Sequence, residues 1–341
     1  MLHIGLDLHK RFSTVSTVAV MDDDGKVLLE DKLYHEDQAR LREFLSAYAG
    51  KAVVTVEATR NWYWMYELLE RLGVTVKLAN ARKVRLIAEA RLKNDKVDPK
   101  ALAQLERTGF LPEAYIPPLL IRDNREYLRY RLTLVMMRTG LKNKVHALLD
   151  KLGIRHRFAD LFCPAGRRFL GQLKPRPVYQ EELTNYLALM DDIECRIVVV
   201  TKEIKRQLKP DSRAKLLMTI PGIGHLTAYL LLNEIGDIKR FATPGKLSAY
   251  GGIVPIVRQS ADHRWQGHIT KEGNRYIRWA LTESAYLAPS KDYALGSFYR
   301  RVAFRRGPLR ARVAVARKLL VAVWCVLTYG EPYKVTQFPT V

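Results

Sequence analysis

Five short runs of apolar and β-branched residues lie within the first 80 residues, and their order constrains the fold more than any other feature. The first three follow one another with only turns between them, whereas helical spacing separates the later ones. This pattern predicts three antiparallel strands followed by two strand–helix units in a mixed α/β domain. The predicted strands are 3–8, 13–21, 26–34, 52–58 and 74–80.

Helical periodicity fills the spaces between the later runs and follows the last one. The predicted helices are 37–49, 61–73, 81–93 and 100–111. The expected order is therefore β-β-β-α-β-α-β-α-α, which is the strand order of ribonuclease-H-like nucleases. We expect one such α/β domain over residues 1–118, and fold alone does not give function.

The middle of the chain has the pattern of two long helices, over 121–152 and roughly 179–208. A connection containing proline and glycine joins them, so we expect an antiparallel pair. Residues 119–210 are thus interpreted as a helical coiled-coil segment that serves as an arm or an oligomerisation stalk. Residues 211–341 are predicted to form a mainly α C-terminal domain.

A glycine-rich turn interrupts the helical pattern of 216–236 and predicts a helix-hairpin-helix. Gly222 and Gly224 would expose backbone N–H groups at a helix start, where a nucleic-acid phosphate can dock. The alternative is a plain helical hairpin that uses glycine for close packing.

The chain carries a formal net charge of +22, and its last 41 residues hold eight basic side chains against one acid, Glu331. Such a field favours a polyanionic partner, with nucleic acid first and an anionic membrane surface second. A merely basic soluble protein is the remaining alternative. We expect late arginines to follow a phosphate backbone: Arg305, Arg306, Arg310 and Arg312. The three dispersed cysteines fit neither a disulfide framework nor a zinc site, and no signal peptide or membrane span is evident, so a cytosolic protein is expected.

Four acids occupy positions where a ribonuclease-H-like domain carries its metal ligands: Asp7, Glu57, Asp95 and Asp98. Taken alone, Asp98 before Pro99 is explained as an N-terminal helix cap, and Asp95 as a solvated loop charge. Brought together, the four carboxylates would repel one another unless a divalent cation neutralised them. Oxygen ligands favour Mg²⁺ or Mn²⁺ over zinc.

Six stretches resemble, in the same order, the IS-one-ten (DEDD) family of insertion-sequence transposases, relatives of the pilin-gene invertases. They are IGLDLHK, VEATRNWYW, KNDKVDPKAL, IPGIGHLTAYLLLNEIGDIKRF, LSAYGGIVP and ITKEGNRYIRWAL. The resemblance implies a RuvC-like domain, a coiled-coil segment and a C-terminal transposase domain. It also implies that the four acids form a catalytic, metal-binding tetrad.

The resemblance further implies a catalytic serine after the motif at 252–255, and the matching residue is Ser260. Cations near it in sequence could hold the scissile phosphate: Arg258, Arg264, Lys271 and Arg275. His263 or His268 could act as the base. The sequence departs from the family at Arg60 and Ala261, where relatives usually have glycine.

From the resemblance we expect a prokaryotic, nucleoid-associated recombinase that cuts and rejoins donor and target DNA through a 5′-phosphoserine, guided by a bridge RNA. Its homo-oligomer would be a dimer that assembles into a tetramer. Two other functions stay open on the residues alone. One is a metal-dependent structure-specific nuclease or Holliday-junction resolvase without serine chemistry, and the other is a non-enzymatic nucleic-acid architectural protein.

Overall fold

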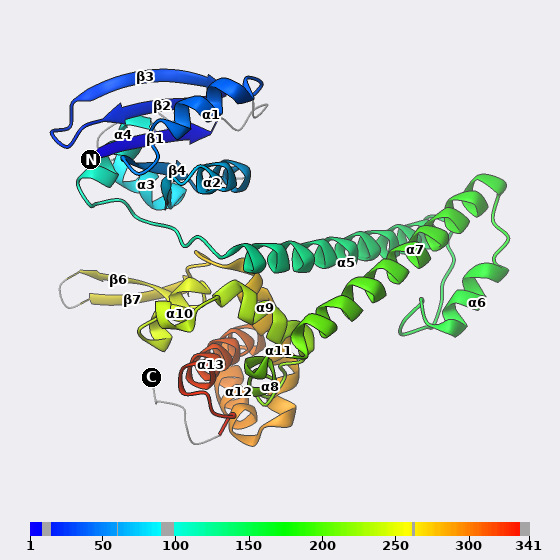
Figure 1. Ribbon diagram of the computed structural model, residues 1–341. Helices are drawn as coiled ribbons and strands as arrows, with labels where there is room; N and C mark the ends of the chain where they lie inside the picture. The colour runs from blue at the N-terminus through cyan, green and yellow to red at the C-terminus, as the bar shows by residue number, and fades with distance from the viewer. Residues whose placement is uncertain (9–14, 60, 90–98, 261–262, 335–341) are drawn as a thin grey trace. The chain divides into compact units, whose positions relative to one another are not determined.

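A computed structural model describes residues 1–8, 15–59, 61–89, 99–260 and 263–334 (Figure 1). Two compact units divide the chain, Met1–Ile116 and Pro117–Val341. The boundary between them lies two residues before the end that the sequence predicted for its first domain. The predicted division of the second unit at residue 210 stays a prediction.

The N-terminal unit is built on a five-stranded sheet with the order β3-β2-β1-β4-β5. β1 pairs antiparallel with β2, and β2 with β3, whereas β1 pairs parallel with β4, and β4 with β5. The strands are β1 Leu2–Leu8, β2 Val15–Met21, β3 Val27–Tyr34, β4 Ala52–Glu57 and β5 Thr75–Ala79. The predicted mixed α/β sheet and the predicted order of strands and helices are confirmed.

Helices cover both faces of this sheet, and β1 is therefore buried on both faces. Ile4 and Leu6 pack in one core with Leu45 of α1 and Met65 of α2. A smaller cluster of Ala79, Val84 and Leu102 connects α3 and α4 to the sheet. The helices are α1 Gln38–Ser46, α2 Trp62–Arg71, α3 Ala81–Glu89 and α4 Pro99–Arg107.

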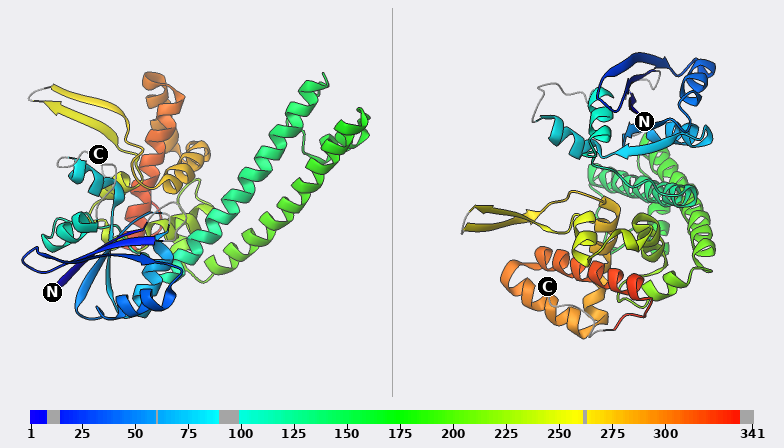
Figure 2. Two further views of the ribbon diagram at one scale, coloured as in Figure 1. Left: turned by 90° about the horizontal axis from the view of Figure 1, so that it is seen from above. Right: turned by 60° about the vertical axis from the view of Figure 1, so that its left-hand side comes forward.

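The C-terminal unit begins with two long antiparallel helices, α5 Leu119–Lys151 and α7 Pro177–Leu208, which lie side by side (Figures 1 and 2). The predicted helix pair is confirmed, and coiled-coil packing between its members stays a prediction. α6, Pro164–Gln172, packs against the far end of the pair through a separate cluster that includes Leu149, Leu170 and Leu183. Near the other end, Leu128 and Ile197 join the main core of the unit.

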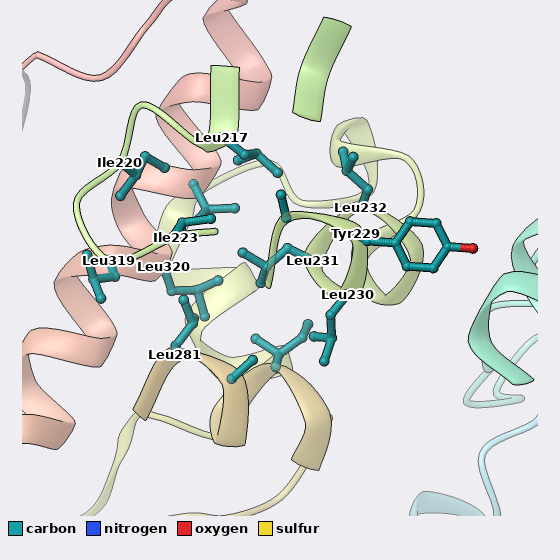
Figure 3. Close-up of a cluster of buried hydrophobic side chains, with 14 of the residues drawn as sticks. Leu217, Ile220, Ile223, Tyr229, Leu230, Leu231, Leu232, Leu281, Leu319 and Leu320 are labelled. Carbon is teal, nitrogen blue, oxygen red and sulfur yellow. The ribbon is translucent and has the colours of Figure 1, made fainter. Parts of the chain in front are cut away.

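That main core gathers short helices around α13, whose residues Val315, Leu319, Leu320 and Val323 are fully buried. Figure 3 shows Leu217, Ile220 and Ile223 facing Leu319 and Leu320 across this core. The remaining elements are α8 Ser212–Leu217, α9 His225–Ile235, the 3₁₀ turn Ile238–Arg240, α10 Pro244–Tyr250, β6 Pro255–Ser260, β7 His263–Ile269, α11 Arg275–Lys291, α12 Tyr293–Arg306 and α13 Pro308–Tyr329. No helix in the described part of the chain is long and apolar enough to cross a membrane.

Candidate active site

The first two predicted acids lie on neighbouring parallel strands of the N-terminal sheet. β1 and β4 pair in a register that sets Leu6 opposite Val56, so Asp7 and Glu57 follow at the same level. Residues at the same level of parallel strands lie on the same face, and their strands are roughly 5 Å apart. Both acids are partly exposed at the carboxyl ends of their strands. The fold therefore brings these two carboxylates together at one edge of the sheet.

The start of α4 lies against the same face of β1. A Cβ built on Gly5 would be 1.8 Å from the carbonyl oxygen of Pro99, the first residue of α4. Any side chain at position 5 would displace the helix, so glycine permits this close approach. Because successive residues of a strand alternate between faces, Gly5 and Asp7 share this face. Asp95 and Asp98 lie outside the described residues.

The other end of α4 is held by a buried ion-pair network. Glu106, in the last turn of α4, pairs with His3 Nδ1 and accepts a hydrogen bond from Lys77 Nζ at 3.1 Å. His3 Nε2 lies 3.0 Å from Asp23 Oδ1. Glu106 is 7% exposed and His3 is 8% exposed, so an uncompensated charge would be costly here. The network fixes α4 across β1 and β5.

These contacts shift two pKa values. The hydrogen bond to Glu106 raises the pKa of Lys77, although partial burial opposes the shift. Hydrogen bonds from the N-terminal amino group and from His3 lower the pKa of Asp23. Sequence reasoning missed the network. One signal was present, because His3 has the same strand parity as Gly5 and Asp7, and thus faces α4.

The donor set at the sheet edge suits a hard cation. Asp7 and Glu57 offer carboxylate oxygens, which Mg²⁺ and Mn²⁺ prefer. Nearby, Thr55 Oγ1 and Thr59 Oγ1 are buried without a hydrogen-bond partner among the described residues. Within the described ranges no group of three His, Cys, Asp or Glu side chains could hold a metal ion. The described residues therefore supply two of the four predicted ligands.

Ser260 is the last residue of β6, at the tip of a two-stranded hairpin. The β6–β7 ladder pairs Ser260 with His263 and Arg258 with Trp265, so these four positions share one face. Figure 2 shows the hairpin projecting away from the helices of its own unit. Trp265 is 57% exposed. Ser260 thus lies in an extended hairpin, a feature that the sequence analysis did not predict.

The base of the hairpin is closed by backbone hydrogen bonds and a buried acid. Thr270 N donates to Val254 O at 2.9 Å, and Asn274 N donates to Tyr250 O at 2.7 Å. Asn274 caps α11 and donates through Nδ2 to Glu234 Oε2 at 2.7 Å. Glu234 is 2% exposed and lies 3.5 Å from Arg125 Nε of α5. The base of the hairpin is therefore fixed to α5 and α9.

The two glycines of the turn before α9 differ in their surroundings. Gly222 has φ +81°, and a Cβ there would be 2.6 Å from Ser284 O of α11. Its close approach is to the protein backbone, which is the packing role considered as the alternative. Gly224 is the N-cap of α9, and a Cβ there would meet open space. Phosphate docking at this turn stays a prediction.

The other predicted cations differ in their surroundings. Lys271 and Arg275 are exposed beside the hairpin base, as are Arg305, Arg306 and Arg310 at the α12–α13 junction. Arg312 is half-buried, with its guanidinium 3.8 Å from the ring centroid of Tyr286 and a hydrogen bond to its hydroxyl. For Arg258 and Arg264 only the backbone in the ladder is described. Nucleic-acid contacts by these residues stay predictions.

Comparison with known proteins gives two family matches. Residues 4–154 match a transposase family of the DEDD IS110 type, and residues 214–300 match the family described as transposase IS116/IS110/IS902. Together the matched segments cover more than two thirds of the chain.

Full-length relatives are transposases by name. The transposase for insertion sequence element IS1111A of Coxiella burnetii is 26% identical over 97% of this chain and 91% of its own length. The transposase for insertion sequence element IS1328 of Yersinia enterocolitica is 27% identical over 97% and 98%. The pilin gene-inverting protein of Moraxella bovis is 34% identical over 36% of this chain and 38% of its own length.

Proposed function

This chain belongs to the IS110/IS116 family of transposases, and we propose that it cuts and rejoins DNA through a phosphoserine formed at Ser260, with a metal-binding acid cluster and an RNA guide. It is a DNA transposase, so its substrate is DNA. The proposal concerns the chemistry, the guide and the assembly. The observation that carries it is the placement of Asp7 and Glu57 at the same level of neighbouring parallel strands, beside the start of α4.

The N-terminal unit is proposed to be RuvC-like, with Asp7, Glu57, Asp95 and Asp98 as its cation ligands. The sheet order β3-β2-β1-β4-β5 supports this, since it sets two carboxylates side by side at the ends of parallel strands. The contact of Pro99 with Gly5 supports it further, because Asp98 is joined covalently to Pro99. A bound Mg²⁺ or Mn²⁺ would neutralise these acids and the charge that develops on the phosphodiester oxygens.

In the proposed cleavage, Ser260 Oγ attacks the scissile phosphorus and a bond forms between them. The bond from phosphorus to the 3′ oxygen breaks, leaving a 5′-phosphoserine and a 3′-hydroxyl that takes up a proton. A base must remove the serine proton, because a neutral hydroxyl is a weak nucleophile. His263 is paired with Ser260 in the ladder, and its position suits that role. Attack by a second 3′-hydroxyl on the same phosphorus then releases the serine and rejoins the strands.

Assembly into a dimer and then a tetramer is part of the proposal. A two-stranded hairpin has little stability alone, and this one presents a 57% exposed Trp265. Such an arm gains order when it packs against DNA or another subunit. We propose that Ser260 meets an acid cluster in the assembled complex, with donor and target DNA between the subunits.

Guidance by RNA is proposed because the excess positive charge suits backbone contacts with a nucleic acid. In an RNA-guided enzyme, base pairing selects the sequence, so the protein needs few base-reading contacts.

A Ser260→Ala variant tests the chemistry. Incubation with labelled donor DNA and Mg²⁺ should give a covalent protein–DNA adduct with the natural protein and none with the variant. Full strand cleavage by Ser260→Ala would favour the second candidate, a metal-dependent nuclease or junction resolvase. That candidate is supported by the position of Asp7 and Glu57 on neighbouring strands of the N-terminal unit, which does not involve Ser260.

A further inference from the structure

The junction of α12 and α13 carries an aromatic ring that packs against almost nothing. Phe304, in the last turn of α12, is 94% exposed, and Leu309, in the first turn of α13, is 72% exposed. Gly307 alone connects the two helices, with φ +82°. Because the turn is one residue long, the two apolar side chains lie on either side of a single corner. The corner therefore presents two large apolar side chains to solvent.

The chain segment that forms this corner carries only positive charge. No acidic residue occurs between Asp292 and Glu331, a segment that contains seven arginines and one lysine. Arg301, Phe304 and Arg305 have the helical spacing that sets side chains on one face. Repulsion is already felt in the cluster, since burial first, and then Arg301 and Arg317, lower the pKa of Lys318. A partner that relieves this repulsion must be anionic.

Resting on the proposed function, we propose that this corner binds unpaired nucleotides, with a base stacked on Phe304 and the flanking phosphates held by Arg301, Arg305 and Arg306. A base offers a flat face to the ring, and each nucleotide brings one phosphate to the arginines. Stacking on an aromatic side chain strengthens single-strand binding by about 5- to 150-fold per base.

An unpaired strand fits better than a duplex. In a duplex the base faces are already stacked, and a ring can reach them only by inserting between two base pairs, which costs unstacking energy. A free strand pays no such cost. An acidic protein surface would satisfy the arginines, yet it would not require an aromatic side chain at position 304 rather than another apolar one.

The test compares the affinity of full-length variants for an oligothymidylate of about 16 nucleotides, roughly one single-strand site, with that for a duplex of equal length. All carry Ser260→Ala, so that no covalent attachment occurs. Fluorescence anisotropy should show that Phe304→Ala weakens single-strand binding by about 5- to 150-fold. Duplex binding should change by less than about twofold. Phe304→Trp should retain the affinity, and Phe304→Leu should lose it.

The matched control is Tyr293→Ala, which removes an 85% exposed aromatic ring from the start of the same helix, beside Asp292. It lies roughly 16 Å along the helix axis from Phe304 and should leave both affinities unchanged. Equal losses on strand and duplex, or full affinity in Phe304→Leu, would overturn stacking. Unchanged affinities in Phe304→Ala would likewise overturn the proposal. Each of these outcomes leaves the Ser260 chemistry standing, because adduct formation is measured separately.

Discussion

The two units hold their candidate catalytic groups in opposite ways. Asp7 lies on β1, the central strand of a five-stranded sheet, with β2 on one side and β4 on the other. Ser260 lies at the tip of a hairpin that has no third strand in the described structure. Acids that repel one another need a rigid support to stay together, and the sheet provides one. A nucleophile that must reach a substrate gains more from extension than from rigidity.

The difference also appears in how each group is supported. α4 is fixed on the sheet at both ends, by the contact between Pro99 and Gly5 and by the Glu106 network. The hairpin is fixed at its base, through Asn274 and Glu234. The N-terminal unit therefore holds its acids in fixed positions, whereas the hairpin extends Ser260 away from the rest of its unit. The two properties can be tested separately.

The largest expected effect separates chemistry from stability in the two units. Asp7→Asn and Ser260→Ala should each lower strand exchange by at least about a thousandfold, because each removes a group that acts on the phosphorus. In thermal unfolding, Mg²⁺ should raise the Tm of the natural protein and of the Ser260→Ala variant alike, since ligands stabilise the state they bind. Asp7→Asn should lose that rise, and chelation by EDTA should abolish it in both other proteins. Strand exchange at the natural rate by Asp7→Asn would show that the acids are structural.

The next effect concerns the buried anchor of α4. Glu106→Ala should destabilise the N-terminal unit by about 3 kcal/mol, because removing one member of a buried ion pair leaves its partners uncompensated. Urea unfolding measures this change. The matched control is Glu113→Ala, which removes the exposed partner of the same Lys77 and should cost less than about 1 kcal/mol. Similar costs for both variants would mean that the network does not anchor the helix.

A smaller effect with opposite signs is expected for two glycines. Gly5→Ala should destabilise by about 1–3 kcal/mol through overpacking against Pro99, and it should also weaken Mg²⁺ binding by shifting α4. Gly140→Ala, in an exposed interior turn of α5 with open space around it, should stabilise by about 1 kcal/mol. Differential unfolding measurements distinguish the two, and a stable Gly5→Ala variant with natural metal affinity would contradict the close approach.

The smallest effect is the pH dependence of the ion pairs around His3. The raised pKa of Lys77 means that its contribution is complete below the unfolded value of about 10.4 and is lost as pH rises through the folded value. The lowered pKa of Asp23 means that its contribution is present above about 3.9 and is lost as pH falls through the folded value. Unfolding midpoints should therefore fall at both extremes. Lys77→Met should flatten only the alkaline side, and loss on the acid side instead would reverse the assignment.

Much of the N-terminal unit was predictable, because strand parity and helical spacing are local signals. Positions 3, 5 and 7 alternate with buried Ile4, Leu6 and Leu8. That alternation already sets Asp7 on the face of the sheet opposite the core formed with α1 and α2. The contact of Gly5 with Pro99 was not predictable, since it depends on how α4 crosses β1. Glu106 is likewise an ordinary helix acid until the fold sets it beside His3 and Lys77.

The hairpin was missed for a different reason. β6 reads PIVRQS and β7 reads HRWQGHI, and their polar residues give no buried alternation. A strand pair that projects from its unit needs no apolar face, so the usual signal is absent. Ser260 could be named from family resemblance, whereas its position at the tip came only from the ladder that pairs it with His263.

The length of the two hairpin strands sets how far Ser260 lies from the base of the hairpin and which side of the hairpin it occupies. Inserting one residue into each strand would move Ser260 outward by roughly 3.3 Å and turn it to the opposite side, whereas two residues in each would move it roughly 7 Å and restore the side. Inserting an odd number of residues into each strand should therefore leave folding unaffected but abolish strand exchange, because Ser260 would lie on the wrong side of the hairpin. Across natural variants, hairpin length should accordingly change in steps of two per strand.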